Sequence, residues 1–241
     1  MTDLVVITGA SSGLGLALAE SVPFPAHIVD ISRSGPPRPS GIDHFPADLS
    51  KPVDWARTGD EISRLVDNHD PDRAVMIHAA GTLTPIGFAG EVDSVAYTSN
   101  VVLNSAAGQV LGHHFLAAVA GRQGSYDLVM ISSGAASGVY AGWSSYGAGK
   151  AALDQWVRNV GAEQEERGGV RVSAIAPGVL DTAMQAEIRS TAGHDFPNVD
   201  RFHDLCDDGA LVDPDDAARR IWEAIENGIE TGSVLDIRGR S

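Results

Sequence analysis

Two side chains that can exchange a proton with a substrate lie close together in the sequence, Tyr146 and Lys150. Because they are four positions apart, a helix would place both on one face. A free tyrosine hydroxyl has a pKa of about 10, which is too high for easy proton exchange at neutral pH. A neighbouring ammonium stabilises the phenolate and lowers that pKa. The pair therefore predicts a general acid in one direction of a reaction and a general base in the other.

A third polar group with a chemical use is Ser133, which ends the apolar run before this pair. Its hydroxyl can hold a substrate oxygen on which negative charge develops. A Tyr-x-x-x-Lys pair alone is common on helix surfaces, so it is informative only in its context. Here it follows a strand that ends in two serines and, earlier, a glycine-rich turn. That order favours proton transfer to or from a carbonyl oxygen.

The glycine-rich turn occupies residues 8–15, directly after the first apolar run. Glycine lets the main chain approach a ligand, and a strand-to-helix turn holds a pyrophosphate against the amides and the positive end of the helix dipole. The three-residue gap between Gly9 and Gly13 departs from the commoner Gly-x-Gly-x-x-Gly pattern. We expect a dinucleotide here. The residues predicted to contact it are Gly9, Ser11, Ser12, Gly13, Leu14 and Gly15.

The end of the second predicted strand, residues 27–32, should lie beside the adenosine ribose of such a cofactor. An acidic side chain there would bind the ribose hydroxyls, whereas an arginine would pair with a 2′-phosphate. Asp30 lies within the strand, and Ser32 and Arg33 lie at its end, so we favour NADP(H). The expected phosphate pocket consists of Ser12, Ser32, Arg33 and Ser34. The alternative, Asp30 as a ribose ligand, stays open.

Asp48 and Leu49 follow the third strand that such a fold requires, and both belong to the predicted cofactor site. The carboxylate of Asp48 can accept a hydrogen bond from the adenine amino group. Alternatively, Asp48 caps a helix that begins near Pro52.

Short runs rich in Val and Ile alternate with helix-length segments along the chain. Because these runs are apolar on both faces, they predict a parallel sheet with helices on both sides. The predicted strands are residues 4–8, 27–32, 74–78, 128–132, 170–175 and 234–237. The predicted helices are residues 14–21, 53–68, 100–120, 145–167 and 214–227, the last capped by Asp213. With no repeat or linker visible, residues 1–241 are expected to form one Rossmann-type α/β domain.

The composition limits the possible partners. The chain has 241 residues and a formal net charge of −15, which disfavours nucleic acid and anionic membranes. No apolar run approaches the roughly 20 residues that span a bilayer, and no signal peptide is recognisable at the N-terminus. The single cysteine, Cys206, fits a reducing cytoplasm. We expect no metal site, and a small molecule as the substrate.

These motifs together resemble the short-chain dehydrogenase/reductase family over essentially the full length. The family's glycine motif matches residues 8–15, and its catalytic serine, tyrosine and lysine match Ser133, Tyr146 and Lys150. The resemblance implies that Asn100 completes a catalytic tetrad and holds a proton-relay water, and that Lys150 also binds the nicotinamide ribose. It further implies cofactor contacts from Ala80, Gly81, Pro177, Gly178, Val179 and Thr182.

One segment departs from the family pattern, His78-Ala79-Ala80-Gly81 in place of Asn-Asn-Ala-Gly. Because Ala80 and Gly81 remain, the main chain can keep its place beside the cofactor. We expect rewired contacts or altered stability there and not lost activity. His78 is interpreted as a core histidine, with a catalytic base as the alternative.

The substrate side is similar to the benzil reductase branch of the family, which is related to sepiapterin reductase. The matching segments are the end of the second strand, residues 81–85, 140–143 and 234–238, and a substrate lid at about 181–212. The resemblance implies NADPH-dependent reduction of a vicinal diketone such as benzil, by a homodimer or homotetramer. The residues expected either to line an aromatic pocket or to pack the lid are Leu83, Tyr140, Trp143, Met184, Ile188, Phe196 and Phe202.

Two other functions stay open. The sequence does not set the direction of the reaction, so the chain can be an NAD(P)-dependent dehydrogenase of secondary alcohols. A cofactor-sensing module without turnover is disfavoured, because such a protein should have lost part of the tetrad.

Overall fold

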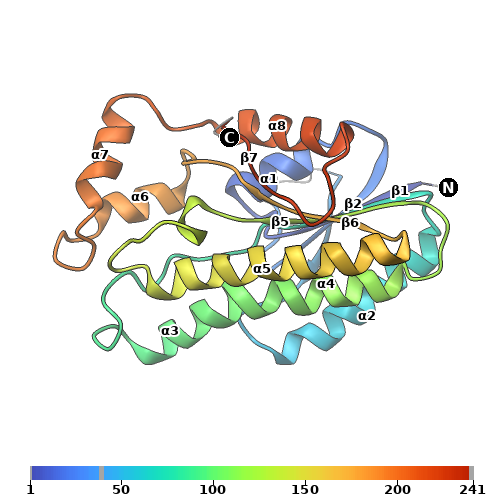
Figure 1. The fold of residues 1–241 in the computed structure, drawn as a ribbon, viewed down its shortest axis with the longest axis horizontal. Helices are drawn as coiled ribbons and strands as arrows, with labels where there is room; N and C mark the ends of the chain where they lie inside the picture. The colour runs from blue at the N-terminus through green and yellow to red at the C-terminus, as the bar shows by residue number, and fades with distance from the viewer. Residues whose placement is uncertain (1, 38–40, 239–241) are drawn as a thin grey trace.

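The architecture is a single parallel sheet between two layers of helices, as the sequence predicted (Figure 1). The computed structural model describes residues 2–37 and 41–238, and seven strands lie in this part of the chain. Their order is β3-β2-β1-β4-β5-β6-β7. The strands are β1 (Asp3–Thr8), β2 (Ala26–Ser32), β3 (Asp43–Pro46), β4 (Arg73–His78), β5 (Ser125–Ile131), β6 (Arg171–Ala176) and β7 (Val234–Asp236). The order reverses between β1 and β4, so a ligand crevice is expected at their carboxyl ends.

Successive residues of each central strand enter two different cores. Val5 and Ile7 of β1 pack under α1 (Gly13–Glu20) and α8 (Pro214–Glu226). Leu4 and Val6 lie in the opposite core, beneath α2 (Val53–His69), α4 (Gly108–Ala118) and α5 (Ser144–Arg167). Figure 1 shows these two helix layers on either side of the sheet. This alternation explains why the strands are apolar on both faces.

The predicted helix over residues 100–120 has a different form in the structure. It begins earlier, as α3 (Ser94–Val101), because the side chain of Asp93 accepts a hydrogen bond from the amide of Ala96 at 2.8 Å and caps the helix. A π-helix over Val102–Ala107 then connects α3 to α4. Such π-helical turns often occur at functional sites.

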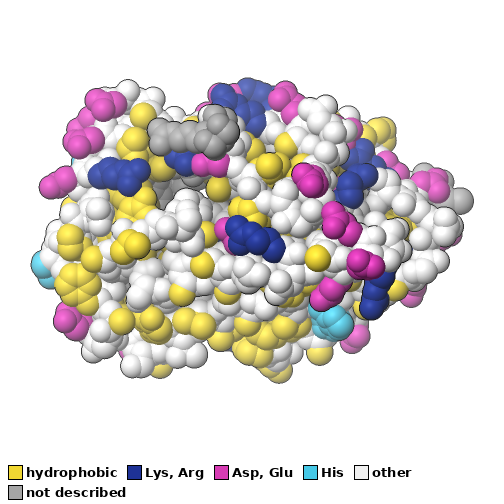
Figure 2. All heavy atoms as spheres, viewed as in Figure 1, with side chains coloured by type: hydrophobic (Ala, Val, Ile, Leu, Met, Phe, Trp, Pro, Cys, Tyr) yellow, Lys and Arg dark blue, Asp and Glu magenta, His cyan; other side chains and the backbone are white. Residues whose placement is uncertain are grey.

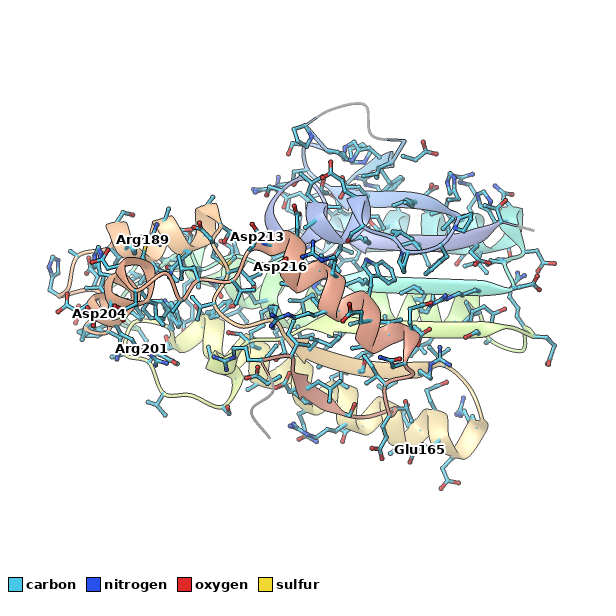
Figure 3. The ribbon with its side chains drawn as sticks, turned by 90° about the horizontal axis from the view of Figure 1, so that it is seen from above. Glu165, Arg189, Arg201, Asp204, Asp213 and Asp216 are labelled. Atoms are coloured by element: carbon cyan, nitrogen blue, oxygen red, sulfur yellow. The ribbon has the colours of Figure 1, made fainter. Side chains whose placement is uncertain are left out.

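Beyond the carboxyl end of the sheet lies a projection formed by α6 (Ala183–Ser190) and α7 (Val199–Asp207). Figure 3 shows Arg189, Arg201 and Asp204 on this projection, away from the sheet, and Glu165 near the opposite end of the molecule. The two ends of the projection meet where Leu180 pairs with Val212 in an isolated parallel bridge. The segment predicted as a substrate lid, at about 181–212, forms this projection; its two helices were not predicted.

The start of α8 agrees with the sequence prediction. Asp213 accepts a hydrogen bond from the amide of Asp215 at 2.8 Å and one from the amide of Asp216 at 3.4 Å.

Within residues 2–37 and 41–238, none of the helices combines the length and the apolar character that a membrane span requires.

Candidate active site

A cavity of about 780 Å³ opens at the carboxyl ends of the central strands. This volume falls in the range of about 300–1,000 Å³ that is usual for sites of small molecules and cofactors. Every residue of the predicted cofactor site lines it except Ser34 and Val179, and so does Ser133. Val179 packs against the apolar cluster beneath the projection instead.

The glycine turn has the geometry of a phosphate cradle. The φ angle of Gly9 is 79°, which favours glycine, and a Cβ added to Gly9 would lie 2.9 Å from the main chain of Ala80. A Cβ on Gly15 would lie 2.2 Å from the carbonyl oxygen of Gly9. Ser12 stands at the N-cap of α1, and among the described residues its side chain makes no capping hydrogen bond. The first amides of the helix are therefore available to an anion, so these residues fit a dinucleotide pyrophosphate.

At the end of β2, the structure separates the two candidates for the ribose contact. Arg33 is exposed and lines the cavity. Asp30 is fully buried, does not line the cavity, and is hydrogen-bonded inside the protein. The geometry therefore gives no support to Asp30 as a direct ligand of the ribose.

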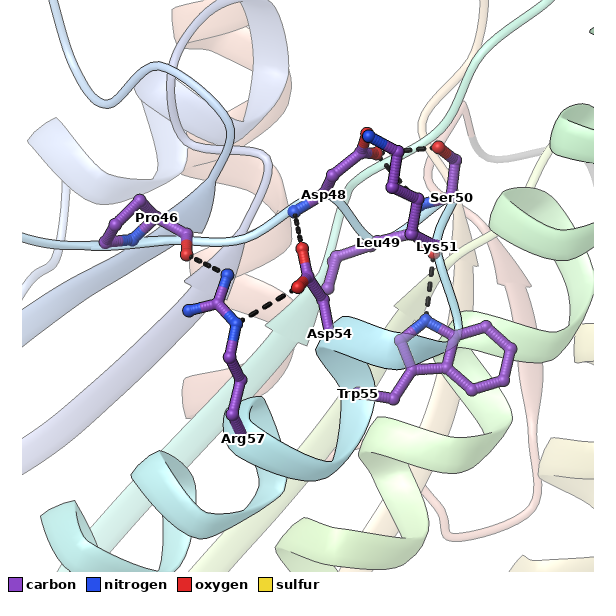
Figure 4. A network of polar contacts seen from close by, with 8 residues as sticks. All are labelled: Pro46, Asp48, Leu49, Ser50, Lys51, Asp54, Trp55 and Arg57. Atoms are coloured by element: carbon purple, nitrogen blue, oxygen red, sulfur yellow. Dashed lines mark hydrogen bonds and ion pairs between the residues drawn. The ribbon is translucent and has the colours of Figure 1, made fainter.

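Asp48 belongs to a network of polar contacts that holds the chain between β3 and α2 (Figure 4). Its Oδ1 accepts hydrogen bonds from the amide and the hydroxyl of Ser50, at 3.2 and 2.6 Å. Burial opposes ionisation, but the hydrogen bonds from Ser50 and Lys51 lower the pKa of Asp48. The N-cap of α2 is Pro52, so Asp48 orders the turn before this helix and does not cap it. An ionised acceptor thus faces the cavity.

Three catalytic candidates lie together, Ser133 just after β5 and the pair Tyr146 and Lys150 on α5. The side chain of Tyr146 is buried and lies beside Ser133. The ammonium of Lys150 donates to the carbonyl oxygen of Ile131 at 2.7 Å and lies 5.9 Å from the centre of the Tyr146 ring. Ser133 also accepts a hydrogen bond from the amide of Ala135 at 3.1 Å, which fixes its hydroxyl beside the tyrosine.

The ionisation of this pair differs from the sequence prediction. Burial raises the pKa of Tyr146, and the hydrogen bond with Ser133 only partly opposes the rise, so the predicted lowering by Lys150 is wrong for this structure. Burial also lowers the pKa of Lys150 to about 8, against the attraction of the Asp154 carboxylate. At neutral pH the tyrosine is therefore a protonated donor beside a charged lysine.

The asparagine expected in the tetrad, Asn100, has its side chain hydrogen-bonded away from the cavity. Its amide nitrogen donates to the carbonyl oxygens of Thr82 and Thr84, at 3.2 and 3.0 Å, and its Oδ1 accepts from Asn104 at 2.9 Å. It is fully buried and does not line the cavity. Asn100 thus fixes the segment after β4.

Sequence reasoning missed Asn104, which lies in the π-helix and nearer to the lysine. A Cβ added to Gly81 would lie 2.9 Å from the Oδ1 of Asn104 and 3.7 Å from the Nζ of Lys150. A Cβ on Gly149, which precedes the lysine, would touch Asn104 at 2.9 Å. Since Asn100 and Asn104 are four positions apart, helical spacing alone could not choose between them.

His78 is a core histidine in the structure. Its Nδ1 lies 2.9 Å from the Thr8 hydroxyl, which gives the rewired contact that the departure from the family pattern led us to expect. Burial lowers the pKa of His78 to about 3, so the ring is neutral. Its Nε2 has no hydrogen-bond partner in the part of the chain that is described, and a Cβ on Gly108 would lie 3.1 Å from it. His78 does not line the cavity, which argues against a catalytic base.

The apolar residues of the substrate side form one cluster that includes Tyr146. Trp143 lies between Tyr146 and the rest of this cluster. Its ring stacks on that of Phe196, with 4.6 Å between the ring centres, and meets the Tyr146 ring edge-on at 5.6 Å. Of the seven side chains expected here, Met184 lines the cavity, whereas Phe196 and Phe202 are buried between the projection and the domain. Most of the cluster therefore packs the projection in place.

Comparison with known proteins agrees with this geometry. A family model described as short chain dehydrogenase matches residues 3–193. The benzil reductase ((S)-benzoin forming) of Bacillus subtilis is 36% identical over 98% of both chains. The sepiapterin reductase of Mus musculus is 32% identical over 96% of this chain and 95% of its own. A 3-oxoacyl-[acyl-carrier protein] reductase from Brucella melitensis, solved with NAD, has the same fold, with a TM-score of 0.81, 16% identity and coverage of 98% and 96%.

Proposed function

Because the chain belongs to the short-chain dehydrogenase/reductase family, in its benzil and sepiapterin reductase-like branch, we propose that it uses NADPH to reduce one ketone of a vicinal diketone. The family and these relatives make it an oxidoreductase that acts on C=O and CH–OH groups with a nicotinamide cofactor. The cofactor form, the substrate and the roles of single residues are our proposal.

The observation that carries the choice of NADPH is the position of Arg33. In the described part of the chain, Arg33 and Lys150 are the lysine and arginine side chains that line the cavity; Arg33 follows β2, and Lys150 lies beside the end of β5. Arg33 is exposed and has no ion-pair or hydrogen-bond partner among those residues, so its guanidinium is available. A guanidinium can bind a phosphate through two parallel hydrogen bonds. This favours a cofactor that carries a 2′-phosphate.

Arg33→Ala should weaken NADPH binding by roughly 1.5–3 kcal/mol and leave NADH binding nearly unchanged, because only NADPH carries the phosphate. Titration of cofactor fluorescence measures both affinities. Arg220→Ala, on an exposed part of α8, is the matched control and should alter neither affinity. A wild-type protein that binds NADH as tightly as NADPH would overturn the choice of cofactor.

At the other end of the cavity, we assign the proton transfer to Tyr146. The bound cofactor supplies the hydride that reduces the carbonyl carbon. Ser133 donates a hydrogen bond to the carbonyl oxygen, and Tyr146 transfers its proton to this oxygen as charge develops there. Lys150 holds a positive charge beside them and orders the ribose. We assign the place of the tetrad asparagine to Asn104, and to Asn100 the ordering of residues 82–84.

The substrate class rests on the named relatives and on the apolar cluster around Trp143 and Met184, which suits an aromatic or alkyl ketone. The test is a panel of carbonyl compounds with NADPH, in which benzil and smaller vicinal diketones are compared with matched monoketones. We expect the diketones to have the higher kcat/KM. If the protein oxidised secondary alcohols but reduced none of these carbonyl compounds, the alternative function as an alcohol dehydrogenase would be favoured.

We further propose that the chain forms a homodimer or homotetramer through its α3–α5 layer. Val95 and Val101 of α3 are 74% and 41% exposed. Figure 2 shows hydrophobic side chains gathered along the lower edge, where α2, α3 and α4 lie in Figure 1. Exposed apolar surface of this kind is typical of subunit interfaces.

Light scattering at micromolar concentration should therefore give two or four times the chain mass of 25.2 kDa. Val95→Glu should shift the protein towards the monomer, because a charge in an apolar interface is unfavourable. Val139→Glu, at a loop residue that is 98% exposed, is the control and should not. A monomeric wild type would contradict the proposal.

A further inference from the structure

A buried carboxylate, Asp30, lies directly behind the adenosine end of the cavity. Its Oδ1 accepts a hydrogen bond from the amide of Ala10, in the glycine turn, at 2.8 Å. Its Oδ2 accepts one from the hydroxyl of Ser32, at the end of β2, at 2.6 Å. The same Oδ2 lies 2.9 Å from the Nδ1 of His44, on β3. One fully buried side chain of β2 thus connects the glycine turn, the end of its own strand and β3, at the edge where the cofactor would bind.

The hydrogen bond to Asp30 also determines whether Ser32 can bind a phosphate. Its hydroxyl hydrogen is donated to Asp30, and its oxygen accepts from the amide of Gly35 at 3.1 Å. A phosphate accepts hydrogen bonds and donates none at its ionised oxygens, so Ser32 is left with nothing to donate to it. Instead, the bonds of Ser32 fold residues 32–35 into a turn that carries Arg33.

The turn also rests on the imidazole of His44. Gly35 has a φ of 71°, and a Cβ added to it would lie 3.0 Å from the His44 ring. The His44 ring therefore packs against the turn at Gly35 and also contacts Asp30. Because Asp30 is buried, each of its oxygens needs such a partner, and the loss of the carboxylate would leave several polar groups unpaired.

We infer that Asp30 is a positioning residue for the cofactor, which fixes the glycine turn and the Arg33 turn relative to each other without touching the nucleotide. The inference rests on the proposed cofactor site. It differs from a direct ribose contact in one measurable respect. A ribose ligand would distinguish the two nicotinamide cofactors, whereas a residue that orders both turns supports the binding of each, because both cofactors share the pyrophosphate.

The test compares the dissociation constants of NADPH and NADH in the wild type, Asp30→Ala and Asp30→Asn. Asp30→Ala should weaken both cofactors by about tenfold or more, because Ala10 and Ser32 lose their common acceptor. Asp30→Asn keeps the shape and an acceptor for Ala10, so its affinities should stay within about threefold of the wild type. At saturating NADPH, kcat should be unchanged in both variants, since no reacting group is moved.

If Asp30→Ala does not fold, Asp30→Thr replaces it. Threonine suits a strand, but its single short hydroxyl cannot bond both Ala10 and Ser32, so the same loss is expected. His44→Ala should weaken the binding of both cofactors less than Asp30→Ala does. In the double variant His44→Ala should add little to the loss of affinity caused by Asp30→Ala, because the two residues contact each other.

Three outcomes would overturn the inference: unchanged affinities in Asp30→Ala, a loss confined to NADH, or a fall in kcat at saturation without a change in affinity. Failure of the proposed function looks different, because the wild type itself would then bind neither nucleotide.

Discussion

Tyr146→Phe should lower kcat for carbonyl reduction by about a hundredfold to ten-thousandfold, the range that a positioned general acid contributes. The substitution removes one hydroxyl that is buried beside Ser133 and leaves the ring in its apolar surroundings. Cofactor affinity should therefore stay within about twofold of the wild type. Steady-state kinetics with a diketone gives the first quantity, and titration of NADPH fluorescence gives the second.

Tyr140→Phe is the matched control for this prediction. Tyr140 belongs to the same aromatic cluster, but its hydroxyl accepts a hydrogen bond from Arg201 at 3.0 Å and does not line the cavity. It should keep most of its kcat. A Tyr146→Phe protein that kept most of its kcat would remove the central role of this residue.

The pH dependence gives an independent check on the same group. Reduction needs the protonated tyrosine and the charged lysine. Since the pKa of Lys150 is about 8 and that of Tyr146 is raised, the rate of reduction should be level at neutral pH and fall above about pH 8. Oxidation of the alcohol needs the phenolate, and because burial raises the pKa of Tyr146 above its ordinary value of about 10, the rate of oxidation should rise only at higher pH than the range in which reduction falls. Parallel profiles in the two directions would contradict the assignment.

Gly15→Ala should abolish cofactor binding and lower the free energy of unfolding by about 3 kcal/mol. The added Cβ would lie 2.2 Å from the carbonyl oxygen of Gly9 and 2.7 Å from its carbonyl carbon. Both are main-chain atoms of the phosphate cradle, so the clash is relieved only if the turn itself moves. Urea unfolding and NADPH titration measure the two effects.

Gly193→Ala is the control for backbone entropy and for added bulk. The atom nearest to its Cβ would be the Cγ1 of Val199 at 3.9 Å, an ordinary contact. This variant should bind NADPH like the wild type. If Gly15→Ala unfolded at the same urea concentration and kept its affinity, the close approach at the glycine turn would have no energetic importance.

Local signals in the sequence were sufficient for the features whose causes are local. The cap of α8 needs only Asp213 and the amides that follow it, and the glycine turn needs only the spacing of its glycines. The parallel sheet followed from strands such as β1, whose residues are buried on both faces. The proximity of Ser133 to Tyr146 followed from their order in the chain, once the fold was assumed.

Features that depend on contacts between distant segments could not be predicted in this way. The strand β3 has three exposed residues and one half-buried residue, so it has no apolar run to mark it. Asp30 was considered as a ribose ligand, because its three partners become visible only when β1, β2 and β3 lie side by side. The pKa of Tyr146 depends on burial, which a four-residue spacing does not report.

Because Leu180 and Val212 pair in a bridge, the sequence of the segment between them can change without disturbing the sheet. The amide of Asp181 donates to the carbonyl oxygen of Val212, and the amide of Val212 donates to that of Val179, each at 2.9 Å. These bonds hold the two ends of the projection side by side, and none of them involves a residue of α6 or α7. Since each doubling of the length of such a loop adds only about 0.6 kcal/mol of closure entropy, insertions there cost little as long as Phe196 and Phe202 keep their packing. Grafting this segment from a relative is thus a direct route to new substrate preferences on an unchanged catalytic frame.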